Sequence, residues 1–307
     1  MRIVFMGTPE FAVKSLERLY LDGHDITGVF TREDKPRNRG MKLSFSPVKM
    51  LALSHGTPVF QPASFKDGKA AETIKELCCD LIVVVAYGKI LPKDILDIPP
   101  SGCINIHGSI LPKYRGAAPV QHAVINGETE TGVTSQYISE KMDAGDIIFV
   151  KKINIDCDET SAELYDQLSI LGAELLGETV DAIKHGEVIR IPQDDSEATY
   201  APLLTKEMSN INWNKTAAEI KCLVRGLQPW PVASMMIDGK ILKVYKVDLS
   251  ENISGKKPGD IISYGKPGIE IACADGTVMI CDVQAPGGKR MSAADYTRGN
   301  PLQKDCL

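Results

Sequence analysis

The chain has 307 residues, 43% of them hydrophobic and 24% charged, which is typical of globular proteins and long enough for about two domains. No apolar run approaches the roughly 18 residues of a membrane-spanning helix. The first residues, Met1-Arg2-Ile3-Val4-Phe5, lead into a strand pattern instead of the longer apolar region of a signal peptide. We therefore expect a cytoplasmic protein without a membrane segment.

The eight cysteines form no C-x-x-C pair, and none has a histidine at a zinc-like spacing. Most lie among apolar residues, where a thiol behaves as a small hydrophobic side chain. We expect free thiols and no metal site. The net charge is −5, yet residues 205–307 carry 14 basic and 11 acidic side chains, so the two parts of the chain differ in the partners they favour.

Strand-like and helix-like segments alternate in the first part of the chain. The expected strands are Arg2–Met6, Asp25–Phe30, Pro58–Phe60, Leu81–Ala86, Ser101–His107, Thr131–Ile138 and Asp146–Ile155. The expected helices are Phe11–Tyr20, Pro47–Ser54, Lys69–Leu77, Pro119–Ile125 and Ser161–Lys184. Thr160 and Glu163 have the spacing of a capping box before the last of these helices. The alternation predicts an α/β fold, a doubly wound Rossmann-like domain.

Polar residues with two prolines follow, and the pattern then changes to short strands separated by glycine-bearing turns. The expected strands are Ala233–Ile237, Lys240–Val247, Gly259–Tyr264, Gly268–Ala272 and Val278–Val283, after a helix at Thr216–Arg225. Five short strands at this spacing favour a small OB-like β-barrel. We expect a catalytic domain at residues 1–189, a linker at 190–210 and a C-terminal domain at 211–307.

Two glycine- or histidine-bearing strand ends could carry chemistry. Gly7-Thr8-Pro9 has only the first glycine of the dinucleotide fingerprint, so we interpret it as a tight turn. Asn105 and His107 are two residues apart at the end of an expected core strand, so both face the same side. An amide beside an imidazole suits the stabilisation of a developing oxyanion, although a lone histidine in such a place is more often structural.

The segment Asn105-Ile106-His107-Gly108-Ser109-Ile110-Leu111-Pro112-Lys113-Tyr114-Arg115-Gly116 resembles the signature of the folate-dependent formyltransferases. Asp143, in Met142-Asp143-Ala144-Gly145-Asp146-Ile147, falls where that family places its catalytic aspartate. The resemblance extends to the Gly7–Phe11 opening, to Val84-Val85-Ala86-Tyr87-Gly88, and to Trp213 and Gln228-Pro229-Trp230-Pro231. Over the whole chain, the sequence resembles those family members that formylate methionyl initiator tRNA.

The resemblance implies 10-formyltetrahydrofolate as the formyl donor and the α-amine of methionyl initiator tRNA as the acceptor. Asn105 and His107 would stabilise the anionic oxygen of the tetrahedral intermediate, while Asp143 would orient His107 and help to remove a proton from the amine. The folate would lie between the strand end Tyr87-Gly88 and the loop formed by Ser109, Ile110, Leu111 and Pro112.

A basic stretch, Thr31–Ser46, follows the second expected strand. Taken alone it is a solvated loop, but the resemblance implies that Arg37, Arg39 and Lys42 bind the tRNA, with Arg39 the key residue. The C-terminal domain is either an RNA platform or a packing module. Three alternatives remain: a glycinamide ribonucleotide formyltransferase, which has no second domain; a formyltransferase acting on an amino-sugar nucleotide; and an RNA-binding protein without catalysis.

Overall fold

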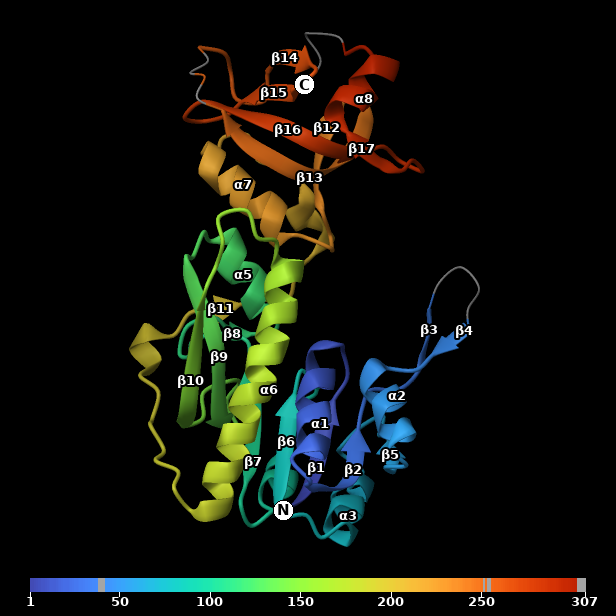
Figure 1. The fold of residues 1–307 in the computed structure, drawn as a ribbon, viewed down its shortest axis with the longest axis vertical. Helices are drawn as coiled ribbons and strands as arrows, with labels where there is room; N and C mark the ends of the chain where they lie inside the picture. The colour runs from blue at the N-terminus through green and yellow to red at the C-terminus, as the bar shows by residue number, and fades with distance from the viewer. Residues whose placement is uncertain (38–41, 251, 253–254, 303–307) are drawn as a thin grey trace. The chain divides into compact units, whose positions relative to one another are not determined.

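The computed structural model describes residues 1–37, 42–250, 252 and 255–302, shown as a ribbon in Figure 1. Contacts between Cα atoms divide the chain into two compact units. The N-terminal unit comprises Met1–Pro119, Glu130–Ile153 and Tyr165–Ala201, and the C-terminal unit comprises Val120–Thr129, Asn154–Leu164 and Pro202–Leu307. The predicted linker is thus shared between the units, and the predicted domain limits at residues 189 and 211 stay a prediction.

A seven-stranded sheet in the order β10-β9-β7-β6-β1-β2-β5 forms the centre of the N-terminal unit (Figure 1). Its strands are β1 (Arg2–Gly7), β2 (Asp25–Phe30), β5 (Val59–Phe60), β6 (Leu81–Val85), β7 (Cys103–His107), β9 (Glu130–Tyr137) and β10 (Ile147–Asn154). From β5 to β7 every pair is parallel, whereas β9 is antiparallel to β7. All five residues of β6 are buried, because helices cover both faces of the sheet.

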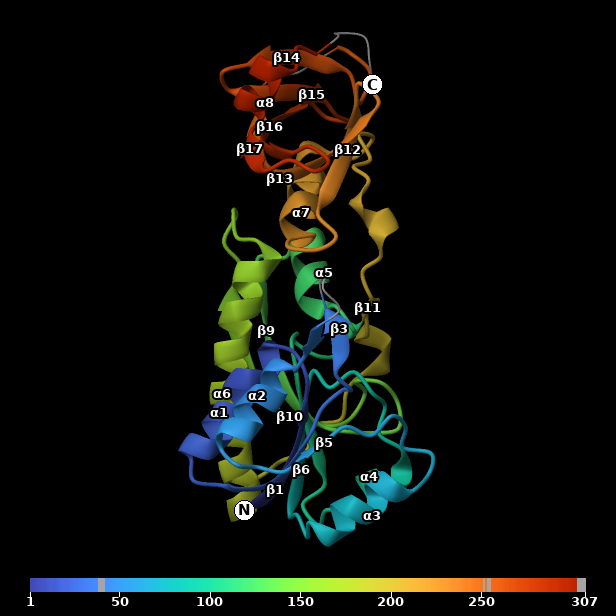
Figure 2. The same ribbon diagram turned by 90° about the vertical axis from the view of Figure 1, so that its right-hand side faces the viewer.

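Helices on both faces confirm the predicted α/β domain. They are α1 (Phe11–Leu21), α2 (Pro47–Ser54), α3 (Lys69–Glu76), α4 (Lys93–Leu96) and α6 (Ser161–His185), of which α4 was not predicted. Figure 2 shows α1, α2 and α6 on one side of the sheet and α3 and α4 on the other. The α2 helix begins where Ser46 accepts a hydrogen bond from the Lys49 N–H and Pro47 takes the first helical position.

Two short strand pairs lie outside the main sheet. The pair β3 (Lys35–Arg37) and β4 (Lys42–Ser44) is an antiparallel hairpin inside the predicted basic loop. The pair β8 (Arg115–Gly116) and β11 (Tyr200–Ala201) is parallel and joins the signature segment to residues that were predicted as linker. These strands are too short to give a periodic pattern in the sequence.

The C-terminal unit contains an antiparallel sheet in the order β12-β13-β16-β15-β14, with β17 on β16. Its elements are α5 (Pro119–Ile125), α7 (Ala217–Gly226), β12 (Ala233–Ile237), β13 (Lys240–Ser250), β14 (Ile261–Gly265), β15 (Gly268–Ala272), β16 (Thr277–Gln284), β17 (Arg290–Ser292) and α8 (Ala293–Gly299). The five predicted strands are present, whereas β17 and α8 were not predicted. Among the described residues no pairing closes this sheet, so the OB-like barrel is not confirmed.

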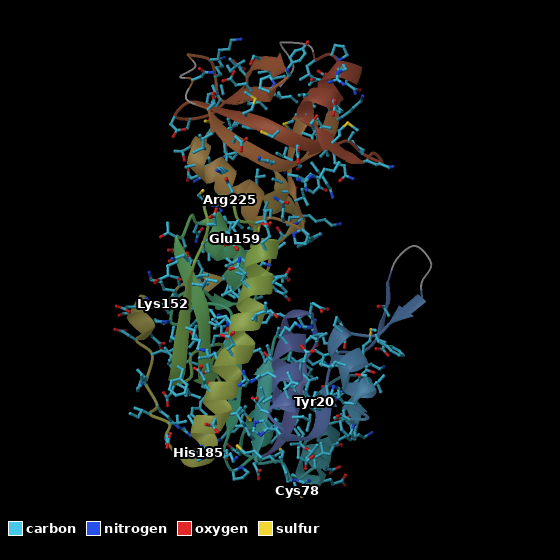
Figure 3. The ribbon with its side chains drawn as sticks, viewed as in Figure 1. Tyr20, Cys78, Lys152, Glu159, His185 and Arg225 are labelled. Carbon is cyan, nitrogen blue, oxygen red and sulfur yellow. The ribbon has the colours of Figure 1, made fainter. Side chains whose placement is uncertain are left out.

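The segment 154–164 belongs to the C-terminal unit through Arg225 of α7. The Nη1 atom of Arg225 donates to the backbone oxygens of Asp156 at 3.0 Å and Glu159 at 2.8 Å, and Figure 3 labels Arg225 beside Glu159. The predicted capping box is present, since the Thr160 N–H donates to the Glu163 carboxylate at 2.9 Å. No helix in the described part of the chain is long and apolar enough to cross a membrane.

Candidate active site

The candidate site lies at the carboxyl ends of three parallel strands. Gly7 of β1 pairs with Val85 of β6, and Val85 pairs with Ile106 of β7, so these strands end at one edge of the sheet. Open α/β sheets bind ligands at this edge. Asn105 is only partly buried, and within the described residues its side-chain amide has no hydrogen-bond partner. That amide therefore keeps its full capacity to bind a ligand.

His107 is the last residue of β7, and its side chain is 6% exposed. Its Nε2 atom lies 2.9 Å from the backbone oxygen of Tyr114. A carbonyl oxygen can only accept, so Nε2 carries a hydrogen, and a neutral ring then has its lone pair on Nδ1. Nδ1 faces the Oδ1 atom of Asp143 at 3.7 Å. The structure thus brings the predicted histidine and aspartate together.

Asp143 lies in the loop between β9 and β10 with a φ of +50°, a conformation that aspartate tolerates better than most side chains. Its Oδ2 atom accepts a hydrogen bond from the Gly116 N–H at 2.9 Å, and Oδ1 accepts from Gln136 at 3.3 Å. Both donors are neutral, and about two of the four acceptor positions of the carboxylate stay available. The carboxylate is held in place without being saturated.

The loop after His107 is fixed by internal hydrogen bonds. The Ser109 hydroxyl is fully buried and donates to the Lys113 oxygen at 2.6 Å. Thr134 of β9 donates to the Ser109 oxygen at 2.7 Å and accepts from the Leu111 N–H at 3.1 Å. Leu111 is 4% exposed, while Ile110 and Pro112 are partly exposed. Four residues of this loop were predicted to bind folate. The side-chain hydroxyl of one of them, Ser109, already forms a hydrogen bond within the protein.

Tyr87 and Gly88, the other two residues predicted for folate, follow β6. The Tyr87 ring is 1% exposed and packs against Phe65 in the core, and burial raises the pKa of Tyr87 to about 12. Its hydroxyl has no hydrogen-bond partner among the described residues. The Gly88 oxygen accepts a hydrogen bond from Arg32. The Tyr87 side chain is thus part of the core, and Gly88 has no side chain to offer a ligand.

Two of the three predicted tRNA-binding residues, Arg37 and Lys42, belong to the β3–β4 hairpin, which extends away from the sheet (Figure 1). Arg37 and Lys42 pair across the hairpin through their backbone, and Arg39 lies outside the described residues. The base of the hairpin is held by an ion pair between Asp34 and Lys49 at 2.5 Å. The hydroxyls of Thr31 and Ser46 also meet there, at 2.8 Å.

The polar residues that surround Asp143 were not predicted from the sequence. Gln193, from the predicted linker, donates to the backbone oxygen of Asp143 at 2.9 Å and to the side-chain oxygen of Gln136 at 3.1 Å. Arg115, 3% exposed, donates to the Gln193 side-chain oxygen. Gln136 follows Thr134 by two residues on a strand, and this polar pair on one face was the available signal. Nothing in the sequence near Gln193 indicates its contacts.

In the described ranges, no group of three His, Cys, Asp or Glu side chains is arranged to hold a metal ion. Residues 1–180 match the family described as "Formyl transferase", and residues 203–301 match "Formyl transferase, C-terminal domain".

Known proteins resemble the chain over nearly its full length. The methionyl-tRNA formyltransferase of Ruminiclostridium cellulolyticum is 47% identical over 98% of this chain and 97% of its own length. That of Alkaliphilus oremlandii is 47% identical over 99% and 98%. Among solved structures, the sugar 3N-formyl transferase WlaRD, crystallised with dTDP and 5-N-formyl-THF, has a TM-score of 0.70 at 20% identity, covering 94% of this chain and 99% of its own. The chain therefore belongs to the formyl transferase family and has both of its domains.

Proposed function

We propose that the chain transfers the formyl group of 10-formyltetrahydrofolate to the α-amine of methionyl initiator tRNA, giving formylmethionyl-tRNA for translation initiation. The observation that carries this proposal is the 47% identity, over nearly the whole of both chains, to proteins named methionyl-tRNA formyltransferase. The pairing of His107 with Asp143 at the carboxyl edge of the sheet supports it. Such a reaction takes place in the cytoplasm, where translation begins.

Asn105 and His107 would act on the formyl oxygen. When the amine nitrogen bonds to the formyl carbon, this oxygen becomes negatively charged, and preorganised donors stabilise it. The Asn105 amide supplies one donor, because no described residue occupies it. The Nε2 hydrogen of His107 is committed to Tyr114, so a protonated His107 would donate through Nδ1, on the side of Asp143. We therefore propose that the reacting atoms lie on the Nδ1 side of the ring.

Asp143 would act on the proton of the amine. Attack leaves an extra proton on the acceptor nitrogen, and a carboxylate with available acceptor positions can take it up. The bond between the formyl carbon and the N10 atom of the folate then breaks as the protonated carboxylate returns this proton to N10. Gly116 and Gln136 hold the Asp143 carboxylate near His107 during this step. An amine is already nucleophilic, so no covalent enzyme intermediate is needed.

We propose that the folate lies between the Tyr87-Gly88 strand end and the Ser109–Pro112 loop. The Tyr87 ring is buried and the Ser109 hydroxyl is bonded to Lys113. Contacts to the pterin ring therefore fall on the backbone and on the partly exposed side chains of Ile110 and Pro112, which suits a flat ring with a few polar edges.

The β3–β4 hairpin and the C-terminal unit would bind the tRNA. Arg37, Arg39 and Lys42 give the hairpin positive charge, and contacts with phosphates weaken as salt rises. We also propose that the antiparallel sheet of the C-terminal unit is an OB-like barrel that contacts the tRNA backbone. Its excess of basic residues supports this role, since 14 basic and 11 acidic side chains fall in residues 205–307.

The acceptor is tested with three amines and one donor, 10-formyltetrahydrofolate. We expect formylation of methionyl initiator tRNA, much weaker use of methionyl elongator tRNA, and none of an amino-sugar nucleotide. The sugar nucleotide is the relevant rival, because one of the solved structures of similar fold is a sugar formyl transferase. Preferential formylation of the sugar nucleotide would overturn the proposed acceptor while leaving the donor in place.

The hairpin is tested with Arg39→Ala. We expect the KM for charged tRNA to rise about tenfold, with the KM for the folate unchanged, because a lost phosphate contact weakens tRNA binding alone. Lys14→Ala, which removes an exposed cation of α1 paired with Glu17, is the matched control and should change neither value. An equal rise in both KM values for Arg39→Ala would indicate a structural role for the hairpin instead.

A further inference from the structure

Asp143 is held at both its side chain and its backbone by one connected set of residues in the N-terminal unit. The Gly116 N–H binds its carboxylate at 2.9 Å, and the Gln193 Nε2 atom lies 2.9 Å from its backbone oxygen. The same Nε2 atom lies 2.7 Å from the Gly145 oxygen. The φ of +50° at Asp143 is sparsely populated for residues other than glycine. Such a conformation persists only where the surroundings determine it.

The orientation of the Gln193 amide is fixed by Arg115. The Nε and Nη2 atoms of Arg115 lie 3.1 Å and 2.8 Å from the Gln193 Oε1 atom. A guanidinium only donates, so the amide oxygen must face Arg115. The amide nitrogen must then face the oxygens of Asp143, Gly145 and Gln136, which lie on its other side. A flipped amide would set like groups against each other at both ends.

Arg115 is in turn held by Asp195. Its guanidinium is 3% exposed and forms an ion pair with Asp195 at 2.9 Å, and this ion pair lowers the pKa of the Asp195 carboxyl. Arg115 also precedes Gly116, the residue whose N–H binds the Asp143 carboxylate. The path from the Asp143 side chain through Gly116, Arg115 and Gln193 therefore returns to the Asp143 backbone. A closed path of this kind restricts both the position and the direction of the carboxylate.

We propose that Gln193, oriented by Arg115 and Asp195, is a positioning residue that sets the carboxylate of Asp143 against His107. The proposal rests on the proposed function, in which Asp143 is catalytic. The Gln193 amide nitrogen contacts Asp143, Gln136 and Gly145, all next to the Asp143 carboxylate, so we expect its loss to lower the rate of the chemical step without changing substrate binding. Displacement of a reacting group by about 1 Å can reduce a rate by about a hundredfold.

The main variant is Gln193→Glu. It keeps an oxygen for Arg115 but replaces the donor nitrogen by a second oxygen that repels the three oxygens opposite. We expect kcat to fall about tenfold or more, with both KM values changed less than about twofold. An unchanged kcat, or a loss that falls on KM alone, would overturn the positioning role.

A double-variant cycle separates positioning from structural damage. Positioning through Asp143 predicts that Gln193→Glu lowers kcat in the parent enzyme but causes no further loss when Asp143→Ala is already present. An equal loss in both backgrounds would overturn the proposal. If Asp143→Ala alone keeps normal turnover, the catalytic role of Asp143 fails, and with it the positioning role of Gln193. If the parent enzyme formylates no methionyl initiator tRNA, the proposed function fails instead, so the two failures are distinguishable.

Asp195→Asn gives a second test that does not disturb the interior, since the Asp195 side chain is 61% exposed. It removes the charge that holds Arg115, and we expect kcat to fall about two- to fivefold with both KM values unchanged. The matched control is Asp194→Asn, the neighbouring carboxylate, whose hydrogen bonds are to Ser196. Equal kcat values for the two variants would contradict the role of Asp195.

Discussion

Two carboxylates, one in each unit, are held in opposite ways. Glu270 in β15 is 4% exposed and accepts hydrogen bonds from four side chains. These are Asn252 at 2.6 Å, Ser263 and Thr277 at 2.9 Å and Ser250 at 3.0 Å. Asp143 is 17% exposed, and among the described residues its carboxylate accepts only from the Gly116 N–H and the Gln136 amide, with His107 at 3.7 Å. A carboxylate has about four acceptor positions, and we call Glu270 saturated because its donors equal that number, three on Oε1 and one on Oε2, whereas Asp143 has two donors.

The number of hydrogen-bond donors distinguishes a carboxylate that stabilises the fold from one that is available for catalysis. A carboxylate with four donors stabilises the fold and has little acceptor capacity left for a substrate proton. The hydrogen bond from Asn252, followed by those from Thr277, Ser263 and Ser250, holds the pKa of Glu270 below its ordinary value despite burial. An unsaturated carboxylate beside an imidazole keeps capacity for a ligand at the cost of weaker support. We therefore expect removal of Asp143 to affect turnover and removal of Glu270 to affect stability.

The largest effect should follow from Asp143→Ala. We expect kcat to fall at least about a thousandfold, equivalent to about 4 kcal/mol of transition-state stabilisation. The free energy of unfolding should fall by only about 1 kcal/mol, because alanine at a positive φ is strained. Single-turnover formylation and urea unfolding measure the two quantities.

Asp143→Asn is the matched control for Asp143→Ala. Asparagine tolerates the same φ and keeps an oxygen for the Gly116 N–H, so it removes the negative charge and the acceptor of the weaker hydrogen bond from Gln136. It should match Asp143→Ala in lost turnover and the parent enzyme in stability. Near-normal turnover in either variant would show that Asp143 is not catalytic, and that an unsaturated carboxylate beside His107 is not needed for the reaction.

The sequence predicted the candidate catalytic residues far better than the residues that hold them in place. Asn105, His107 and Asp143 belong to segments with a specific pattern, and the structure places the latter two within 3.7 Å. The support around Asp143 was not predictable, because Gln193 lies 50 residues away along the chain in a polar segment without periodicity. Side-chain partners of this kind are set by tertiary packing, which single-sequence patterns do not contain.

Glu270 shows the same limit within a correctly predicted strand. The strand Gly268–Ala272 was predicted with its observed bounds. By alternation, Glu270 between Ile269 and Ile271 should face solvent, yet all three are buried. Its donors come from β13, β14, β16 and the residue Asn252, so only the assembled sheet shows that a charge is satisfied there. The strand was predictable from local residues, whereas the burial of its carboxylate was not.

Glu270→Ala should destabilise the C-terminal unit by about 3 kcal/mol, because it leaves buried donors without their acceptor. Both tryptophans of the chain, Trp213 and Trp230, lie in this unit, so their fluorescence during urea unfolding reports on it. Below the unfolding transition, kcat should stay within about twofold of the parent value. A large loss of kcat without loss of stability would show that saturation does not distinguish structural carboxylates from catalytic ones.

Glu270→Gln should have the smallest effect, about 1 kcal/mol near neutral pH, because glutamine retains an oxygen for three of the four donors and loses only the charge.

The ordinary pKa of this group is 4.5, and the folded protein lowers it. Ionised Glu270 therefore stabilises the fold fully above about pH 5.5, and this contribution disappears as the pH falls through 4.5 towards the folded value. The glutamine variant has no such proton to bind. The stability difference between parent and variant should thus be constant from pH 7 to about 5.5 and shrink as the pH falls to about 3.5, when followed by tryptophan fluorescence in urea. A difference that grows on acidification would mean that the folded protein raises this pKa, and that the four donors do not offset the burial of the charge.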